Sequence, residues 1–189
     1  LNTASILSAL GFIHNRREEY THAESLLQRA LLIQEKALGS DHLDLADTLN
    51  NLGYSSFVQG LYSQAEAYHK RALAIREKTL GPEHSDVALS LSNLGKVSFA
   101  QERNQHAEGF HQRALAIREK ALGPEHFVVT YDLLGLGKLS MRQGDYYQAE
   151  RLLKRALAIR EQTREEDHPD IAECFVLLAV CRKEADAQE

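Results

Sequence analysis

The side chains with the greatest chemical potential in this sequence are nine histidines and two cysteines. Four of the histidines recur every 42 residues, and these are His42, His84, His126 and His168. Zinc ligands must lie about 2.0–2.3 Å from one ion, and side chains one whole repeat apart cannot converge on the same ion. Their regular spacing indicates instead a structural contact that is repeated in each unit. His106 and His111 are five residues apart, which misses the i, i+4 spacing of a helical metal-binding pair. We therefore expect no metal site.

Acidic and nucleophilic residues show no catalytic arrangement either. One glutamate recurs in each repeat, at Glu24, Glu66, Glu108 and Glu150. Each falls in the first turn of a predicted helix, where a negative charge favours the helix dipole. The sequence contains no H-E-x-x-H, phosphate-binding loop, G-x-S-x-G or paired C-x-x-C motif. We expect no catalytic residue and no cofactor.

Cys174 and Cys181 lie seven residues apart on one predicted helix. That separation is a rise of about 10 Å, too long for a disulfide. The cysteines are predicted to be buried thiols, which indicates a reducing, cytoplasmic location. The net charge of −5 gives no overall attraction to nucleic acid or membrane surfaces, and no apolar run is long enough to cross a bilayer. Because the chain begins with Leu1, we interpret it as a piece of a longer protein.

The regular histidines belong to a repeat that covers the whole chain. The segments "RALAIREKTLGPEH" at 71–84 and "RALAIREKALGPEH" at 113–126 differ at one position and are 42 residues apart. The same offset relates "LSALGF", "LNNLGY", "LSNLGK", "LLGLGK" and "FVLLAV". These blocks predict a single domain, 1–189, with units 1–42, 43–84, 85–126 and 127–168 and a final helix at 169–189.

Both blocks of each unit have the apolar spacing of an amphipathic helix, and no segment alternates like a strand. We expect helical hairpins over about 1–37, 43–79, 85–121 and 127–163, with a lone helix near 169–184. Between the blocks, Gly60 and Gly144 supply turns, and Glu18 and Glu102 take their place in the other units. After each second block, a glycine such as Gly81 ends the helix.

The spacing L-x-x-L-G, then alanine twelve residues later and again seven later, resembles the tetratricopeptide repeat. Gly53, Ala65 and Ala72 match the small positions of that family in the second unit. The 42-residue period resembles the kinesin light chain-like type, which is common in bacterial proteins. The resemblance implies a right-handed superhelical solenoid of antiparallel helix pairs, four pairs plus one extra helix. The sequence departs from the family's usual aromatic position, which holds His14, Ser56, Ser98 and Ser140.

In arrays of this family the first helices line a concave groove, which implies a protein or peptide partner. Residues at the groove positions vary from unit to unit, as a surface that recognises a specific partner requires. The resemblance implies that Asn51 and Asn93 hold peptide backbone, although both also fit as consensus surface residues. The candidate peptide-binding residues are Asn51, Tyr54, Asn93, Lys96, Tyr131, Lys138 and Arg142. Their basic members favour an acidic segment.

These observations predict a non-catalytic protein–protein interaction scaffold, with no enzyme activity. The alternative is a self-association or autoinhibitory regulatory domain of a larger signalling or catalytic protein. The last helix is apolar on nearly all sides, yet no second block follows it. Either a continuation has been cut away or another molecule covers this surface, because exposed apolar patches usually mark contacts. We expect a tendency to form a homodimer through this helix.

Overall fold

The computed structural model describes residues 2–163 and 169–186. Within these ranges the chain forms nine α-helices and one short 3-10 helix, and no residue lies in a strand. The elements are α1 (Asn2–Arg16), α2 (Tyr20–Leu38), α3 (Asp44–Val58), α4 (Tyr62–Leu80), α5 (Ser85–Ala100), α6 (Asn104–Leu122), η1 (Phe127–Val129), α7 (Thr130–Arg142), α8 (Tyr146–Thr163) and α9 (Pro169–Asp186). The all-helical prediction is confirmed. None of the described helices has the length and apolarity needed to span a membrane.

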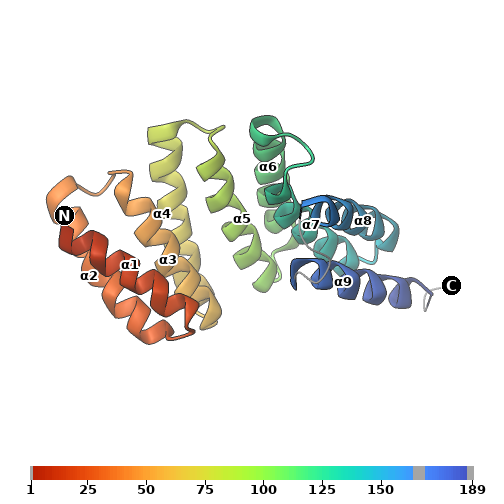
Figure 1. Ribbon diagram of the computed structural model, residues 1–189, viewed down its shortest axis with the longest axis horizontal. Coiled ribbons are helices and arrows are strands. Elements are labelled where there is room, and N and C mark those ends of the chain that lie inside the picture. Colours follow the sequence, from red (N-terminus) through yellow and green to blue (C-terminus); the bar gives the residue numbers. More distant parts are fainter. Residues whose placement is uncertain (1, 164–168, 187–189) are drawn as a thin grey trace.

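The helices follow one another along the molecule, from α1 at one end to α9 at the other (Figure 1). Each helix packs against the next one in the chain, so that α1 pairs with α2, α3 with α4, α5 with α6 and α7 with α8. The last helix, α9, packs against α8. This is the predicted solenoid of four helix pairs and one extra helix.

The small residues of the repeat lie where the two helices of a pair come closest. A β-carbon added to Gly53 would lie 2.5 Å from the His69 ring, and one added to Gly11 would lie 2.5 Å from the Leu27 side chain. The two alanines of the repeat pattern are fully buried in each second helix, and these are Ala23, Ala30, Ala65, Ala72, Ala107, Ala114, Ala149 and Ala156. Small side chains are needed here because a larger one would separate the paired helices.

Ala114→Leu is expected to lower the free energy of unfolding by about 1–3 kcal/mol. Ala114 has no exposed surface and packs with Val87, Ala88 and Leu91 of α5, so three added carbons have no space to occupy. Urea denaturation monitored by circular dichroism measures the change. Lys78→Ala is the control, because the Lys78 side chain is 70% exposed, and its cost should stay within about 0.5 kcal/mol. Equal losses for the two variants would contradict the repeat register.

The linker histidines have the structural role that their spacing predicts. The Nδ1 atom of His84 accepts a hydrogen bond from the backbone N–H of Asp86, at 3.2 Å. His42 and His126 accept equivalent bonds from the residues two positions ahead, at 3.3 and 3.4 Å. Each histidine therefore satisfies one of the free N–H groups at the start of the following helix. His168 and the altered linker at 164–166 lie outside the described residues.

The turns inside the hairpins also follow the prediction. Gly60 and Gly144 have positive φ angles of 77° and 79°, and Glu18 and Glu102 adopt the same left-handed conformation at 63° and 60°. A non-glycine residue is uncommon there, so these two glutamates show that the turn geometry is retained even without glycine. One local feature is not evident from the repeat, since the fourth unit begins with the 3-10 helix η1.

The last helix is covered on one side only. Ile171, Cys174, Leu178 and Cys181 are buried, and the last three belong to the core cluster that includes α7 and α8. The prediction that both cysteines pack in the interior is confirmed. The other side of α9 exposes large apolar side chains, with 53% of Phe175, 62% of Val176 and 44% of Val180 accessible to solvent.

Candidate binding groove on the concave face

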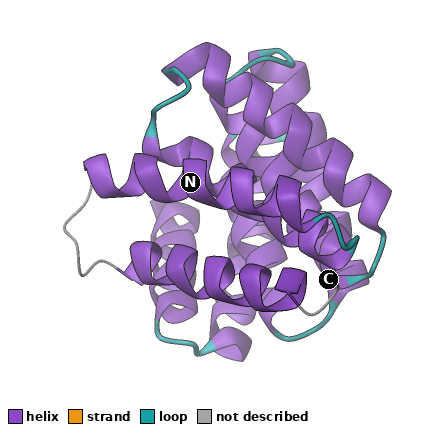
Figure 2. Ribbon diagram, turned by 90° about the vertical axis from the view of Figure 1, so that its right-hand side faces the viewer, coloured by secondary structure: helices purple, strands orange, loops and turns teal. Residues whose placement is uncertain are grey.

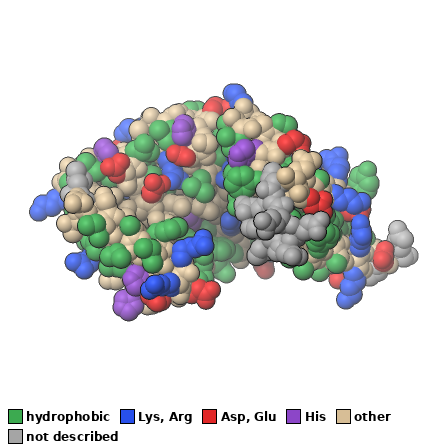
Figure 3. Space-filling view, in the orientation of Figure 1, with side chains coloured by type: hydrophobic (Ala, Val, Ile, Leu, Met, Phe, Trp, Pro, Cys, Tyr) green, Lys and Arg blue, Asp and Glu red, His purple; other side chains and the backbone are tan. Residues whose placement is uncertain are grey.

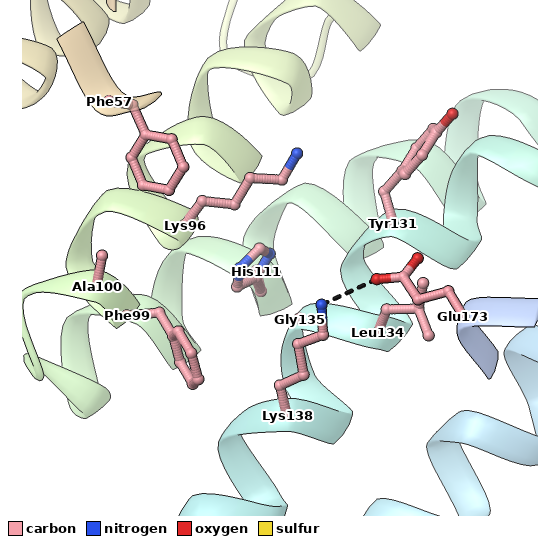
Figure 4. Close-up of a pocket in the computed structure, with 10 residues that line it drawn as sticks. All are labelled: Phe57, Lys96, Phe99, Ala100, His111, Tyr131, Leu134, Gly135, Lys138 and Glu173. Atoms are coloured by element: carbon pink, nitrogen blue, oxygen red, sulfur yellow. Dashed lines mark hydrogen bonds and ion pairs between the residues drawn. The ribbon is translucent and has the colours of Figure 1, made fainter. Parts of the chain in front are cut away.

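Successive first helices line one hollow on the surface of the solenoid. A pocket of about 390 Å³ is formed by side chains from α3, α5, α6, α7 and α9. Figure 3 shows the surface hollowed in the middle of the molecule, over α5. The lining residues, shown in Figure 4, are Phe57, Lys96, Phe99, Ala100, His111, Tyr131, Leu134, Gly135, Lys138 and Glu173.

The structure brings three of the seven predicted groove residues together in this pocket. Lys96, Tyr131 and Lys138 line it, from α5 and α7. The Lys96 ammonium lies 6.0 Å from the centre of the Tyr131 ring. Asn51, Tyr54, Asn93 and Arg142 are not among its lining residues.

Lys96 differs from Lys138, the other lysine that lines the pocket, in its contacts with carboxylates. No described carboxylate lies within ion-pair distance of its ammonium group, and its side chain is exposed to the pocket. Desolvation by the surrounding protein lowers the pKa of Lys96, and the charges of Arg118 and Lys138 act in the same direction. The carboxylates of Asp132 and Glu173, which lie beyond ion-pair distance, oppose this effect without cancelling it. A lowered pKa means that the ammonium form is disfavoured in the free protein, so a ligand anion placed beside Lys96 would stabilise it.

Lys138 already has a partner inside the chain. Its Nζ atom lies 2.9 Å from Oε1 of Glu173 in α9 (Figure 4). Nη1 of Arg160 lies 3.4 Å from the other carboxylate oxygen of Glu173. Burial alone would raise the pKa of Glu173, but the hydrogen bonds and charges of Lys138 and Arg160 outweigh that effect and lower it. The last helix thus places a carboxylate at the edge of the pocket.

Two other predicted residues make contacts between repeats. Asn93 donates a hydrogen bond from Nδ2 to Oδ1 of Asn50, at 2.6 Å. Arg142 donates to the backbone oxygen of Phe99 at 2.8 Å, and its guanidinium carbon lies 3.5 Å from the centre of the Phe99 ring. Both side chains therefore help to join one repeat to the one before it.

The other two predicted residues lie nearer the N-terminus, on α3. The backbone oxygen of Asn51 accepts a hydrogen bond from Asn15, while the Asn51 side chain has no hydrogen bond to any described residue. Tyr54 is 47% exposed, and its ring meets the ring of Tyr20 edge-on at 6.5 Å. Both residues lie on α3, outside the lining of the pocket.

A buried polar cluster lies beneath the pocket. Asp132 has no exposed surface, and its carboxylate bonds the ring of His111 at 2.9 Å, the Ser92 hydroxyl at 2.7 Å and the Arg118 guanidinium. The His111 ring fills the space between Gly95 and Gly135, where a β-carbon would lie 2.6 Å from it in each case. Sequence reasoning did not identify this cluster. One feature of the sequence could have indicated it. Asp132 is charged, whereas the same repeat position holds the uncharged Thr48 and Ser90 in the preceding units.

The cluster does not have the geometry of a nucleophilic catalyst. The Ser92 hydroxyl faces the carboxylate of Asp132 and the backbone oxygen of Ala88, whereas an activated serine is bonded to a histidine. Arg118 and His111 bond the carboxylate of Asp132, and Arg118 also donates to the Ser92 hydroxyl, so the four side chains form a closed network. Among the described residues, no group of three or more histidine, cysteine or acidic side chains is placed to hold a metal ion.

The paired helices, their small crossing residues and the pocket lined by the first helices define a helical-repeat solenoid. The family model described as tetratricopeptide repeat matches residues 2–55, 44–120 and 129–189. The chain belongs to the tetratricopeptide repeat family. The family and the fold make it a protein-interaction scaffold of a kind that is generally non-catalytic.

Several solved structures share this fold. BtubC (BKLC) from P. vanneervenii is 25% identical with a TM-score of 0.80, over 96% of this chain and 74% of that one. A putative kinesin light chain with nearly identical TPR-like repeats from Podosopora anserina is 24% identical with a TM-score of 0.78, over 98% and 87%. The apo form of RapI has a TM-score of 0.82 at 16% identity, over 97% and 64%. A comparison with curated proteins found no match.

Proposed function

We propose that this scaffold binds an acidic segment of a partner protein in its concave pocket. The observation that carries the proposal is the position of Lys96, a cation inside a pocket of about 390 Å³ with no described carboxylate in ion-pair distance. A partner carboxylate beside Lys96 would supply the missing counter-charge. The proposal includes a reducing, cytoplasmic location, which two buried thiols support.

The walls of the pocket favour a polypeptide over a free ion. Phe57, Phe99 and Leu134 provide apolar surface around the ammonium group, and Tyr131 provides an aromatic face with a polar tip. A side chain that ends in a carboxylate has apolar carbons for these walls and a charge for Lys96. Such pockets bury most of a ligand group and use a few polar contacts to orient it.

The remaining predicted residues would contact the rest of the segment. Asn51 has a side-chain amide without a described partner, and an amide can both donate to and accept from peptide backbone. Tyr54 offers exposed aromatic surface beside it. Asn93 would have to exchange its bond with Asn50 before it could hold a ligand, so we assign the larger contribution to Asn51. The summed contacts are modest, which implies an affinity in the micromolar range.

Lys96→Glu is expected to weaken the binding of acidic peptides about tenfold or more, because it replaces attraction by repulsion inside the pocket. Fluorescence anisotropy with labelled acidic peptides measures the dissociation constant, and peptides carrying Gln and Asn in place of Glu and Asp test the charge requirement. The attraction should decrease as salt is raised. Lys36→Glu makes the same charge change on an exposed residue of α2 and should leave binding unchanged. Equal affinities for Lys96→Glu and Lys36→Glu would reject the pocket.

A second candidate function is autoinhibitory regulation within a larger signalling or catalytic protein. Glu173 favours it, because this carboxylate of α9 already engages Lys138 and Arg160 at the pocket's edge. In the same titration, Glu173→Gln would bind acidic peptides more tightly than the parent if Glu173 competes with the partner. An unchanged or weaker affinity would leave Glu173 with a structural role only.

A further inference from the structure

Lys96 and Lys138 occupy the same position in successive repeats, but only Lys138 has a carboxylate partner. Glu173 follows Lys138 by 35 residues, and Tyr131 follows Lys96 by the same separation. The Nζ atom of Lys138 lies 2.9 Å from the Glu173 carboxylate, whereas Nζ of Lys96 lies 6.0 Å from the centre of the Tyr131 ring. The pocket therefore holds two equivalent lysines, one facing a carboxylate and the other an aromatic ring.

The two partner residues come from successive first helices. Tyr131 belongs to α7, and Glu173 belongs to α9, the helix at the end of the molecule that faces the viewer in Figure 2. Figure 4 shows the ion pair of Lys138 with Glu173, and Lys96 has none with the residues drawn. The missing partner of Lys96 is therefore explained by one residue of the neighbouring repeat, Tyr131.

The surroundings of Lys96 favour its neutral amine. Desolvation in the pocket lowers the pKa of Lys96, and the opposing charges of Asp132 and Glu173 do not cancel this effect. The neutral amine carries a free electron pair and is the nucleophilic form of lysine. Apolar side chains line the same pocket, and these are Phe57, Phe99 and Leu134.

The other described lysines lack this combination of features. Lys36 and Lys183 have no described carboxylate within ion-pair distance, but both are exposed and neither lines the pocket. The remaining five form ion pairs, and these are Lys70, Lys78, Lys120, Lys138 and Lys154. Among the described lysines, Lys96 alone lies in the pocket without a carboxylate partner.

We propose that Lys96 is a modification site whose Nζ atom is acylated by a short-chain acyl phosphate. The amine nitrogen attacks the carbonyl carbon and forms an N–C bond, the C–O bond to phosphate breaks, and phosphate leaves with that electron pair. The nitrogen releases one proton to water, so lysine and acyl phosphate yield acyllysine, phosphate and a proton.

The pocket suits both the reagent and the product of this reaction. The phosphate group is an anion, which the lysines of the pocket attract. The product is a neutral amide, so the desolvated position no longer has to hold a charge. The acyl carbons lie against the apolar walls, and a pocket of about 390 Å³ has room for them.

Acylation also removes the positive charge that the proposed function requires. In this respect the inference rests on the proposed function, whereas the reaction itself does not. Acylation of Lys96 would prevent the acidic segment from binding, and a bound segment would protect Lys96 from acylation. The modification is thus a means of switching the pocket off.

Initial rates of acetylation by acetyl phosphate test the reaction in the absence of any peptide. Mass spectrometry after cleavage at glutamate, which does not depend on unmodified lysine, measures the rate at each site. Lys96 is expected to react faster than Lys36, the exposed reference, and faster than Lys138, the ion-paired lysine of the same pocket. A rate at Lys96 that does not exceed the rate at Lys36 would overturn the proposal.

Two variants of the partner residue test the cause. Tyr131→Glu gives Lys96 the carboxylate that Lys138 already has, and should slow Lys96 to the rate of Lys138 or below. Tyr131→Gln has the same shape without the charge and should slow Lys96 less. Glu173→Gln removes the partner of Lys138 and should accelerate its acetylation. Circular dichroism checks the fold of each variant, and equal rates at Lys96 in Tyr131→Glu and Tyr131→Gln would contradict the role of the missing carboxylate.

Titration of the acetylated chain with acidic peptides separates this inference from the proposed function. Acetylation should abolish binding by the parent, whereas treated Lys96→Arg, which keeps its charge and has no amine to acylate, should bind as it does untreated. Unchanged binding by a parent acetylated at Lys96 would reject the pocket as the peptide site and leave the modification site standing. Peptide binding that depends on Lys96, together with no acetylation at Lys96, would overturn this inference alone.

Discussion

Asp132→Ala is expected to lower the free energy of unfolding by about 3–5 kcal/mol, because it leaves a buried cation without its counter-charge. The Arg118 side chain is only 5% exposed, and the Asp132 carboxylate is the anion that it contacts. The same change removes the partner of His111 at 2.9 Å and of Ser92 at 2.7 Å. Urea denaturation followed by circular dichroism measures the loss through the midpoint concentration.

Asp86→Ala is the matched control for this prediction. The Asp86 side chain is 54% exposed and lies 3.7 Å from His84, so its removal should cost no more than about 0.5 kcal/mol. A loss below about 1 kcal/mol for Asp132→Ala would show that Arg118 reaches water or another anion once the carboxylate is removed.

The preceding repeat supplies a rescue experiment. There the equivalent arginine, Arg76, bonds the Ser90 hydroxyl at 2.7 Å and takes its carboxylate from Asp47, at 2.6 Å. Ser90 and Asp47 correspond to Asp132 and Leu89 in the next unit. The double change Asp132→Ser with Leu89→Asp transfers this arrangement to Arg118 and should recover more than half of the stability that Asp132→Ser alone loses.

The second large effect is a loss of stability in acid that originates at His69. This side chain is buried against Gly53, and its Nδ1 atom has no hydrogen-bond partner among the described residues. Desolvation, together with the charges of Lys96 and Arg76, lowers the pKa of His69 from 6.5 to about 4. The folded protein therefore holds His69 neutral at pH values where the unfolded chain would bind a proton.

The sign of the effect follows from proton linkage. Between about pH 6.5 and pH 4 the unfolded state binds the extra proton, so stability decreases as the pH falls through this window. A difference of about 2.5 pKa units between the unfolded and folded states lowers the free energy of unfolding by an amount on the order of 3 kcal/mol near pH 4. Above pH 7 His69 should contribute no pH dependence.

His69→Leu should remove this part of the pH dependence without disturbing the fold, because Leu27 and Leu153 occupy the same position in the first and fourth units. Thermal unfolding of the parent and the variant at a series of pH values from 7.5 to 4.5 is compared. His106→Leu, at an exposed position of α6, controls for the loss of a histidine. Parallel stability curves for the parent and His69→Leu would contradict the lowered pKa.

The groove could be foreseen only in part. The repeat spacing places Lys96, Tyr131 and Lys138 on successive first helices, and the structure brings all three into one pocket. Spacing cannot show which cation has a partner. Lys138 forms an ion pair with Glu173 of α9, whereas no described carboxylate lies within ion-pair distance of Lys96.

The buried cluster shows a similar limit. A repeat pattern identifies the interior positions because each one has the same neighbours in every unit. It does not reveal that three arginines at one repeat position form ion pairs with carboxylates on different helices. Arg76 uses Asp47 of its own pair, while Arg118 and Arg160 use Asp132 and Glu173 of the next first helix.

Within the described residues, the sequence by itself determined the nine helices, the hairpin turns, the small crossing residues and the contacts of His42, His84 and His126 in the linkers. Each of these depends on neighbours at a constant separation along the chain, so a 42-residue period is enough to specify them. Only the tertiary structure decided the pocket, the internal partners of Asn93 and Arg142, and the uncovered side of α9. Those features join side chains that differ from unit to unit, and the distances between them are set by how each helix pair is positioned on the next.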